Sequence, residues 1–400
     1  MASQSLFIFG LGYTSTGIAR QAQSRDIRVV STTKRLQQLS PLASEAHQLL
    51  LFDPAAKQQL DEEGMRALQG ATYVVTSIPP VAAKLYDPVL QAQQRALRQA
   101  AASPDCQISG LGYLSSTGVY GDWQGGWVDE SCEPRTATGR GLLRLEAEAA
   151  WAALAQQLRL PLTIFRLGGI YGPRRSVLHN LQTQAQPNSS AVRRGQQRHT
   201  SRCHVADVAQ AVLADMQRRS LLHHMSLPDG MQQDPPQQQQ QGQEKFTWPG
   251  LRVGNRYVDV INVVDDEPAP RGDVEGYARQ LLGSDQADAS PTPQSVAAGD
   301  GSSSSSAMQA QSSSSPAQLS QKEGSTPKQQ NSLRSSSSSS SGRRKEVLEE
   351  KRVRNDKLKA ALGVQLLAPT YKEGLDSMHA GSIAPFGVED LECLFSSNRR

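Results

Sequence analysis

Two glycines near the N-terminus, Gly10 and Gly12, stand where a chain can bind phosphate through its backbone. They follow the apolar run Leu6–Phe9 and precede a helix-like segment. A G-x-G turn between a strand and a helix lets backbone N–H groups and the positive helix end approach a pyrophosphate. Ser15 replaces the third glycine of the fingerprint G-x-G-x-x-G. The pattern predicts dinucleotide binding, with a plain tight turn as the alternative, at Gly10, Gly12, Tyr13, Thr14 and Ser15.

The residues that end the second predicted strand distinguish NAD from NADP. An acid there binds the ribose 2′-hydroxyl of NAD, whereas basic side chains accommodate the 2′-phosphate of NADP. The chain reads Ser31-Thr32-Thr33-Lys34-Arg35, without an acid. We therefore expect NADP as the cofactor, with NAD as second choice; an exposed basic loop is the alternative. The expected contacts are Thr33, Lys34 and Arg35, with Asp53 beside the adenine and Ser77 and Pro79 beside the nicotinamide half.

Four further motifs follow along the chain. They read L-S-S-T-G-V-Y-G-D at Leu114–Asp122, R-L-G-G-I-Y-G-P at Arg166–Pro173, R-C-H-V-A-D-V-A at Arg202–Ala209 and I-N-V-V-D-D-E-P at Ile261–Pro268. The first two end predicted strands, and the carboxyl ends of parallel strands face the ligand crevice. We therefore expect a hydroxyl of Ser116 or Thr117 to reach a substrate oxygen.

The ordered motifs resemble the extended short-chain dehydrogenase/reductase family, the nucleoside-diphosphate-sugar epimerases and dehydratases, over residues 5–283. Residues 351–355 and 362–364 also resemble the C-terminal lobe of that family, and the chain looks most like an atypical bacterial and plastid-lineage branch. The resemblance implies a Rossmann fold, a nicotinamide cofactor and a small-molecule substrate, anionic or a sugar nucleotide. It makes Thr117 the family's Ser/Thr position. For His204 and Asp207 at a helix start we favour capping and packing; the resemblance gives a substrate contact through Arg202 or His204 as the alternative.

The chain departs from the family at the proton-transfer pair. In the family, a Tyr of Y-x-x-x-K moves the proton at the substrate hydroxyl, and the Lys lowers the pKa of that Tyr. Aligning Glu148 with the family's helix places Arg140 at the Tyr position and Arg144 at the Lys position, and none of the nine tyrosines has Lys four residues later. Arginine stays protonated, so it serves as neither acid nor base, but it binds anions bidentately. Arg140 and Arg144 are thus candidates for an anionic ligand or the cofactor, with a solvated helix face as the alternative.

Thr117 and Tyr120 remain as catalytic candidates. Tyr120 carries the one phenol near the expected site. Without a Lys to lower its pKa from about 10, it is a poor base at neutral pH, and a structural role in the V-Y-G turn is the alternative. No metal-ligand spacing is present among His, Asp and Glu. Two hypotheses follow: an NADP-dependent epimerase, dehydratase or oxidoreductase that lacks the Tyr-Lys pair, or a non-catalytic NADP-binding sensor or scaffold.

Alternating strand-like and helix-like segments must position these residues. Apolar runs such as Tyr73–Ile78 and Leu162–Leu167 alternate with amphipathic stretches such as Lys84–Ala102 and Gly141–Leu158. This order predicts an α/β fold, a doubly wound parallel Rossmann sheet with a small C-terminal substrate lobe and disordered inserts. The expected parts are a dinucleotide-binding domain (1–222), a Gln/Pro-rich insert (223–256), a returning strand and helix (257–283), a disordered Ser-rich insert (284–342), a lobe (343–380) that starts with a helix over Arg343–Leu362, and a tail (381–400).

Composition narrows the class of protein further. The chain has 400 residues and a net charge of +4, too small a surplus to indicate nucleic-acid binding. No run of about 18 apolar residues exists, so no transmembrane helix is expected. The four cysteines lie far apart, which favours a reducing compartment over a disulfide framework. With no signal peptide recognised, we expect a cytoplasmic protein, with a plastid as second choice; the sequence does not indicate the oligomeric state.

Overall fold

A computed structural model describes residues 4–56, 58–81, 87–186, 192, 195–225, 247–248, 251–252, 257–283 and 348–396. Met1–Asp285 and Leu348–Arg400 form one compact unit, and Gln286–Val347 form a second unit that lies outside the described residues. The predicted Ser-rich insert and most of the predicted Gln/Pro-rich insert therefore also lie outside them.

Seven parallel strands form the central sheet in the order β12-β7-β5-β4-β1-β2-β3. The chain winds outward from β1 in both directions, so the strand order reverses between β1 and β4, where ligands of doubly wound sheets bind. The predicted fold class is confirmed. The strands are β1 (Ser5–Phe9), β2 (Arg28–Thr33), β3 (His47–Leu51), β4 (Tyr73–Thr76), β5 (Gly110–Ser116), β7 (Leu162–Leu167) and β12 (Val258–Val263).

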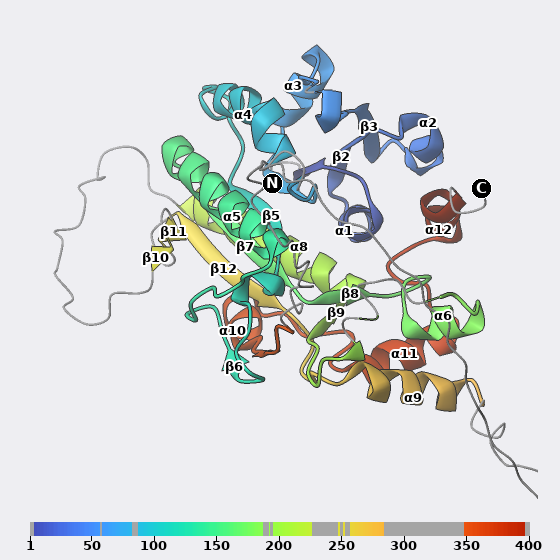
Figure 1. Cartoon of the computed structure of the whole chain (residues 1–400). Coiled ribbons are helices and arrows are strands. Elements are labelled where there is room, and N and C mark those ends of the chain that lie inside the picture. Colours follow the sequence, from blue (N-terminus) through green and yellow to red (C-terminus); the bar gives the residue numbers. More distant parts are fainter. Residues whose placement is uncertain are drawn as a thin grey trace, which may run out of the picture. The chain divides into compact units, whose positions relative to one another are not determined.

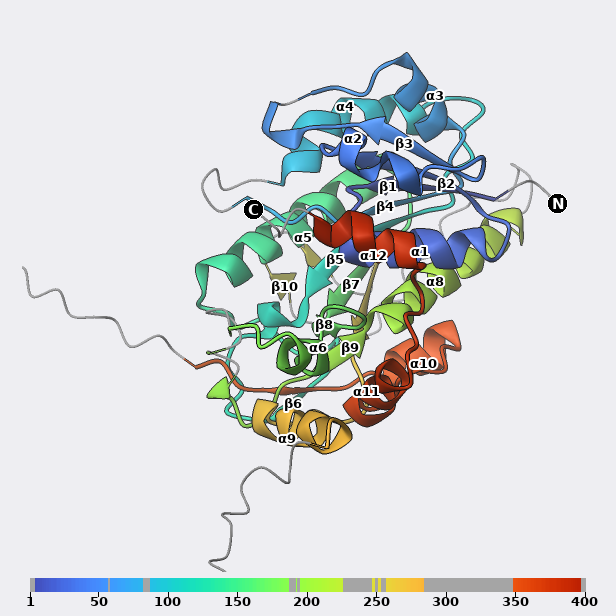
Figure 2. The same ribbon diagram turned by 90° about the vertical axis from the view of Figure 1, so that its right-hand side faces the viewer.

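Helices cover both faces of this sheet (Figures 1 and 2). Successive side chains of a strand point to opposite faces. Accordingly, Leu6 and Ile8 pack with α1 (Tyr13–Gln23) and α8 (Val205–Met225), whereas Phe7 and Phe9 belong to the core of the other face. That second core is built with α3 (Glu62–Gln69), α4 (Pro88–Ala101) and α5 (Gly139–Leu158). Burial on both faces explains why these strands are almost continuously apolar.

The smaller elements gather beyond the carboxyl ends of the strands. A cluster around Leu178, Val274 and Leu375 joins α6 (Val177–Gln182), α9 (Arg271–Leu281) and α11 (Tyr371–His379). Two short parallel ribbons form outside the central sheet: β8 (Gly169–Tyr171) with β9 (Arg202–His204), and β6 (Trp127–Val128) with β13 (Arg352–Val353). The remaining elements are α2 (Leu36–Leu39), α10 (Asp356–Leu362), α12 (Val388–Phe395), η1 (Ser40–Leu42), η2 (Pro54–Ala56), η3 (Thr117–Tyr120), β10 (Thr247–Trp248) and β11 (Leu251–Arg252).

Two expectations for the C-terminal part are wrong. The helix predicted over Arg343–Leu362 is limited, among the described residues, to α10, because residues 348–355 are extended and β13 pairs with β6. The segment predicted as a tail contains α12, whose Leu391 and Leu394 are buried. No described helix is long and apolar enough to cross a membrane.

Candidate functional site

The glycine turn after β1 is held by two serine hydroxyls. Ser15 Oγ donates to the Gly10 carbonyl at 2.7 Å and accepts from the Gly12 N–H at 2.8 Å. Ser77 Oγ, from the end of β4, donates to the same Gly10 carbonyl at 2.7 Å. Gly10 has φ +91°, and a Cβ there would lie 2.4 Å from Cγ1 of Ile78. A serine in the third fingerprint position is therefore accommodated because its hydroxyl closes the turn.

The same turn leaves space for a ligand at Gly12. A Cβ built on Gly12 meets no heavy atom within 4 Å, and the first turn of α1 holds no acidic residue. An open glycine at a helix N-terminus fits the pyrophosphate of a dinucleotide. Thr14 is half-buried there. The Tyr13 ring instead packs 4.9 Å from the Phe386 ring, and its hydroxyl donates to the Pro173 carbonyl at 3.0 Å.

The end of β2 lies beside this turn, because the Leu11 N–H donates to the Thr32 carbonyl at 2.8 Å. Thr33 is buried and its Oγ1 accepts from the Arg35 N–H at 3.1 Å. Lys34 is exposed and Arg35 is half-buried. The predicted adenine-side residue Asp53 follows β3 and is half-buried, whereas Pro79 after β4 is exposed. The structure thus brings the predicted cofactor residues to one edge of the sheet.

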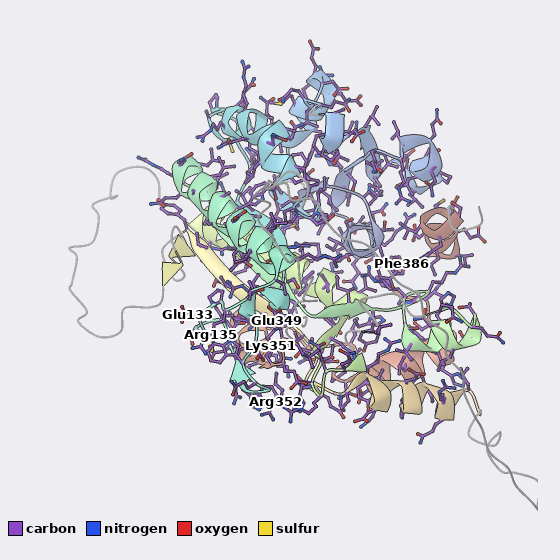
Figure 3. All side chains as sticks on the ribbon, viewed as in Figure 1. Glu133, Arg135, Glu349, Lys351, Arg352 and Phe386 are labelled. Atoms are coloured by element: carbon purple, nitrogen blue, oxygen red, sulfur yellow. The ribbon has the colours of Figure 1, made fainter. Side chains whose placement is uncertain are left out.

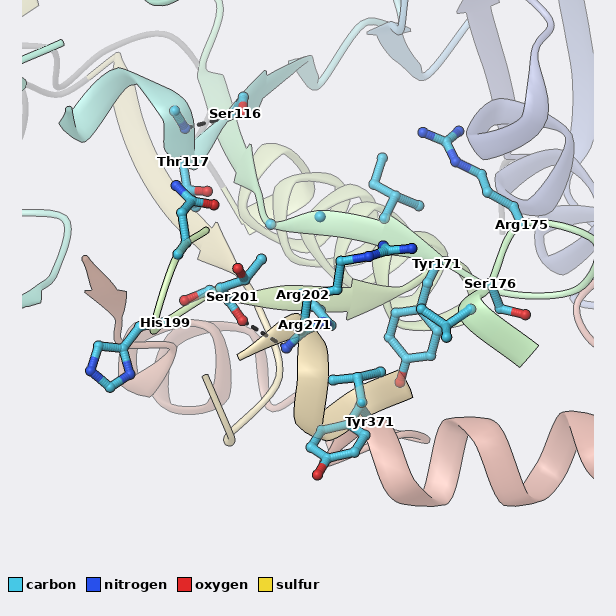
Figure 4. Close-up of a pocket in the computed structure, with 18 of the residues that line it drawn as sticks. Ser116, Thr117, Tyr171, Arg175, Ser176, His199, Ser201, Arg202, Arg271 and Tyr371 are labelled. Atoms are coloured by element: carbon cyan, nitrogen blue, oxygen red, sulfur yellow. Dashed lines mark hydrogen bonds between the residues drawn. The ribbon is translucent and has the colours of Figure 1, made fainter. Parts of the chain in front are cut away.

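A cavity of about 780 Å³ opens at the carboxyl ends of β5 and β7. Figure 4 shows Thr117 and Tyr371 toward opposite ends of it in this view, with Arg202 and Arg271 between. Strand ends contribute Ser116 and Thr117, the β8–β9 ribbon contributes Tyr171 and Arg202, and α9 and α11 contribute Arg271 and Tyr371. Arginine and lysine outnumber carboxylates among the described lining residues, which favours an anionic ligand; the cations are Arg174, Arg175, Arg202, Arg271 and Lys351.

The two predicted catalytic residues occupy different environments. Thr117 lines the cavity, and its Oγ1 donates to the Leu167 carbonyl at 3.3 Å. Tyr120 is fully buried and is not among the described lining residues. Its hydroxyl donates to Asn262 Oδ1 at 2.8 Å, and burial raises the pKa of Tyr120 to about 12. This geometry supports the structural interpretation of Tyr120.

The two arginines of α5 are likewise not among the described residues that line the cavity. Arg140 is exposed in the first turn of the helix. Arg144 points toward β5, where its Nη1 donates to the Leu114 carbonyl at 2.6 Å. An anionic ligand or the cofactor was predicted for this pair, with a solvated helix face as the alternative; neither guanidinium lines this cavity.

Of the two candidate residues on β9, Arg202 is among the described residues that line the cavity and His204 is not. Arg202 is 9% exposed and lines the cavity, with Nη1 and Nη2 donating at 2.8 Å to the carbonyls of Thr200 and Ala269. The His204 ring lies edge-on to the Tyr171 ring, and its Nδ1 is 3.3 Å from the Ala206 N–H. Burial lowers the pKa of His204 to about 4, so its imidazole is neutral at physiological pH and caps α8.

Sequence reasoning missed an extended segment, residues 348–354, which we call the arm. Glu349, Lys351 and Val353 of the arm line the cavity. Figure 3 shows Glu349 and Lys351 near Glu133 and Arg135. These three residues are two positions apart, which is the spacing of side chains on one face of a strand. The segment was assigned to a helix from the sequence, so this spacing was not used. Within the described residues, no group of His, Cys, Asp and Glu could hold a metal ion.

Comparisons with known proteins identify the family and the fold. A family model described as the NAD dependent epimerase/dehydratase family matches residues 7–225. No curated protein matches the chain. A functionally unknown conserved protein from Silicibacter pomeroyi DSS is 27% identical, with a TM-score of 0.58 over 96% of this chain and 100% of its own.

Two further solved structures share the fold at lower identity. One is the dTDP-glucose 4,6-dehydratase from Bacillus anthracis str. Ames in complex with NAD, 11% identical, with a TM-score of 0.58 over 94% of this chain and 96% of its own. The other is the UDP-N-acetylglucosamine 4-epimerase from Bacillus cereus, 10% identical, with a TM-score of 0.53 over 94% of this chain and 98% of its own.

Proposed function

Since the chain belongs to the NAD dependent epimerase/dehydratase family, we propose that it binds a nicotinamide dinucleotide at the Gly10–Ser15 turn and acts on a sugar nucleotide or a similar hydroxylated anion. The observation that carries the proposal is one cavity with hydroxyls at the strand ends and arginines opposite them. The bound dinucleotide would supply hydride transfer to or from a carbon of the substrate.

Arg202 is the residue best suited to hold the anionic part of the substrate. Its hydrogen bonds to the carbonyls of Thr200 and Ala269 use two of the five N–H donors of the guanidinium. Within the described part of the chain, no carboxylate lies within 4.0 Å of its side-chain nitrogens. Burial lowers the pKa of Arg202 although the buried Asp265 carboxylate opposes this effect, so an anionic ligand would stabilise the guanidinium further. Arg202 would therefore bind a phosphate, with Arg271 on the same cavity wall.

Thr117 would bind a substrate hydroxyl at the opposite end. Its side chain is buried in the cavity wall at the start of η3, and Ser116 caps that turn by accepting the Gly118 N–H at 3.1 Å. Because the one O–H of Thr117 donates to the Leu167 carbonyl, its Oγ1 would accept a hydrogen bond from a substrate hydroxyl and so orient the oxygen whose carbon exchanges a hydride. It positions the substrate but does not replace a proton-transfer group.

We further propose that NADP is preferred over NAD. Support comes from the absence of an acid at the end of β2 and from the cations Lys34 and Arg35 in its place. Replacing both cations with alanine should weaken NADPH binding by about 10- to 100-fold and leave NADH binding unchanged, because only NADPH carries the 2′-phosphate. Fluorescence titration with each nucleotide measures both affinities. Arg28→Ala, at the other end of β2, is the matched control.

A Gly12→Asp variant tests the turn itself, because its carboxylate would oppose a pyrophosphate in the open space at Gly12. Unchanged NADPH affinity in this variant would contradict the cofactor site.

A non-catalytic NADP-binding sensor or scaffold is the second candidate function. It is favoured by the presence of Arg140 and Arg144 where the family has its Tyr and Lys. Incubating the protein with NADP and either UDP-N-acetylglucosamine or dTDP-glucose, with products followed by NMR, separates the two candidates, since a sensor would bind without turnover.

A further inference from the structure

The arm presents alternate side chains to the cavity. Glu349, Lys351 and Val353 line it, whereas the intervening Glu350 pairs with Arg198 at 2.9 Å. Period-two alternation is what an extended strand produces, so residues two apart share a face. The arm thus brings a carboxylate and an ammonium group to a cavity that no described residue of α5 lines.

Backbone hydrogen bonds fix the arm along the segment Trp123–Val128. The N–H groups of Arg352 and Arg354 donate to the carbonyls of Gly126 and Val128 at 2.9 and 2.8 Å, and the Trp123 N–H donates to the Glu350 carbonyl at 2.8 Å. A side chain on an element held in this way is preorganised, as catalytic groups require.

The Glu349 carboxylate lies at the start of α5. Its Oε1 accepts from Thr136 Oγ1 at 3.1 Å and from the Ala137 N–H at 3.2 Å. These residues directly precede Thr138, which caps α5 by accepting the Gly141 N–H at 3.2 Å. The first turn of α5 is where the family pattern has its tyrosine, here Arg140. Glu349 is the one carboxylate among the described lining residues, and within the described chain no hydrogen bond reaches its Oε2.

We propose that Glu349 is the general base that replaces the missing tyrosine; this inference rests on the proposed function. When the substrate alcohol is oxidised, its O–H bond breaks and the proton passes to a Glu349 oxygen. The electron pair of that bond would form the carbonyl, and an oxidised nicotinamide dinucleotide held at the Gly10–Ser15 turn would accept the hydride from the carbon. In the reverse direction, Glu349 returns the proton to the carbonyl oxygen. A carboxylate performs this exchange, whereas Arg140 and Arg144 do not.

The substitution Glu349→Gln tests the proposal, because the amide keeps the shape and can still accept at one oxygen but does not take a proton. With NADP and UDP-N-acetylglucosamine or dTDP-glucose as probes, kcat should fall by about 10²- to 10⁴-fold. The dissociation constants of NADPH and of each probe, measured by titration, should stay within about threefold of wild type. The matched control is Glu133→Gln, a half-exposed carboxylate paired loosely with Arg135 at 3.9 Å, which should leave kcat unchanged.

A labelling experiment gives a readout independent of turnover. A carbodiimide with a small amine should modify Glu349 and Glu133 in the free protein, and NADPH with UDP-N-acetylglucosamine should protect Glu349 alone. Unprotected Glu349 despite probe binding, or equal kcat in Glu349→Gln and wild type, would overturn the role of Glu349 and leave the proposed function standing. A wild-type protein that binds NADPH but converts neither probe would instead overturn the proposed enzyme and this role with it.

Discussion

A buried ion pair connects the strand ends beneath the cavity. Glu148 of α5 and Arg166 of β7 are both fully buried, and Arg166 Nη2 lies 2.7 Å from Glu148 Oε2. Ser115 Oγ donates to the other carboxylate oxygen at 2.5 Å, and the Arg166 guanidinium lies 4.8 Å from the centre of the Tyr120 ring. These contacts hold together the ends of β5 and β7, which are directly followed by Thr117 and Gly168.

Glu148→Gln should destabilise the fold strongly, because it leaves the Arg166 charge buried without its counter-ion. The expected loss in free energy of unfolding is about 3–5 kcal/mol. Urea unfolding measures it, with Glu146→Gln, an exposed carboxylate on the same helix, as the control. A loss no larger than that of the control would show that Arg166 finds another partner or stays hydrated.

Some site residues could be predicted from neighbouring residues in the sequence, and others could not. Gly10, Gly12 and Ser15 lie within six positions of one another, so local spacing was enough to predict their turn. Arg140 and Arg144 were placed correctly on a helix, but spacing does not tell where a long side chain ends, and Arg144 binds the carbonyl of Leu114. Glu349 was missed because its position depends on strand pairing with residues more than 200 positions earlier.

At the scale of elements, Asp207 links α8 to the loop before α11. Its Oδ1 accepts from the Leu367 N–H at 2.6 Å and its Oδ2 from the Ala368 N–H at 3.2 Å. That loop leads into α11, which brings Tyr371 to the cavity. Burial outweighs the two amide donors and raises the pKa of Asp207 to about 6.

This shift predicts a pH-dependent contribution to stability. The folded protein holds the Asp207 proton up to about pH 6, whereas the unfolded chain releases it near pH 4. The contribution is therefore complete below about pH 4 and lost as the pH rises to about 6. Relative to Asp207→Asn, the wild type should lose about 2–3 kcal/mol of unfolding free energy between pH 4 and pH 7. Urea unfolding at both values checks this, and the exposed Asp356→Asn should show no such difference. If the wild type and Asp207→Asn differed in unfolding free energy by the same amount at both pH values, Asp207 would ionise at its ordinary pKa.

Elements were predicted well where local pattern and tertiary contacts agree. The apolar runs of β1, β4 and β7 match their burial on both faces, so hydrophobicity alone located them. Residues 343–362 are rich in Lys, Glu, Arg and Leu, which favour a helix. Pairing of β13 with β6, together with burial of Val353, makes residues 352–353 a strand despite that composition. Such an outcome depends on a distant strand and is not visible in the local pattern.

On the scale of the whole molecule, the C-terminal segment returns to the N-terminal turn (Figures 1 and 2). The Phe386 ring packs on the Tyr13 ring, and Figure 3 shows Phe386 near α1. In addition, Gln38 Nε2 donates to the Cys393 carbonyl at 2.9 Å. Arg174 Nη1 donates to the Leu391 carbonyl at 3.3 Å. α12 therefore joins the dinucleotide side of the crevice, represented by α1 and α2, to the cavity side beyond β8.

One ion pair holds α12 in this place. Arg20 of α1 binds Asp390 through Nε at 2.8 Å and Nη2 at 2.6 Å, and Asp390 is fully buried.

Asp390→Asn should lower the free energy of unfolding of α12 by about 1.5–3 kcal/mol, the contribution of hydrogen bonds to a charged partner. Because α12 packs at the periphery of the sheet, that energy should appear as local opening. Amide exchange in residues 388–395 should become about 10- to 100-fold faster, while exchange in β1 and β4 stays the same. Hydrogen exchange followed by mass spectrometry measures both, with the exposed Glu389→Gln as control. Equal acceleration in α12 and the central strands would mean instead that α12 unfolds only together with the sheet, and that the two ends of the chain form a single cooperative unit.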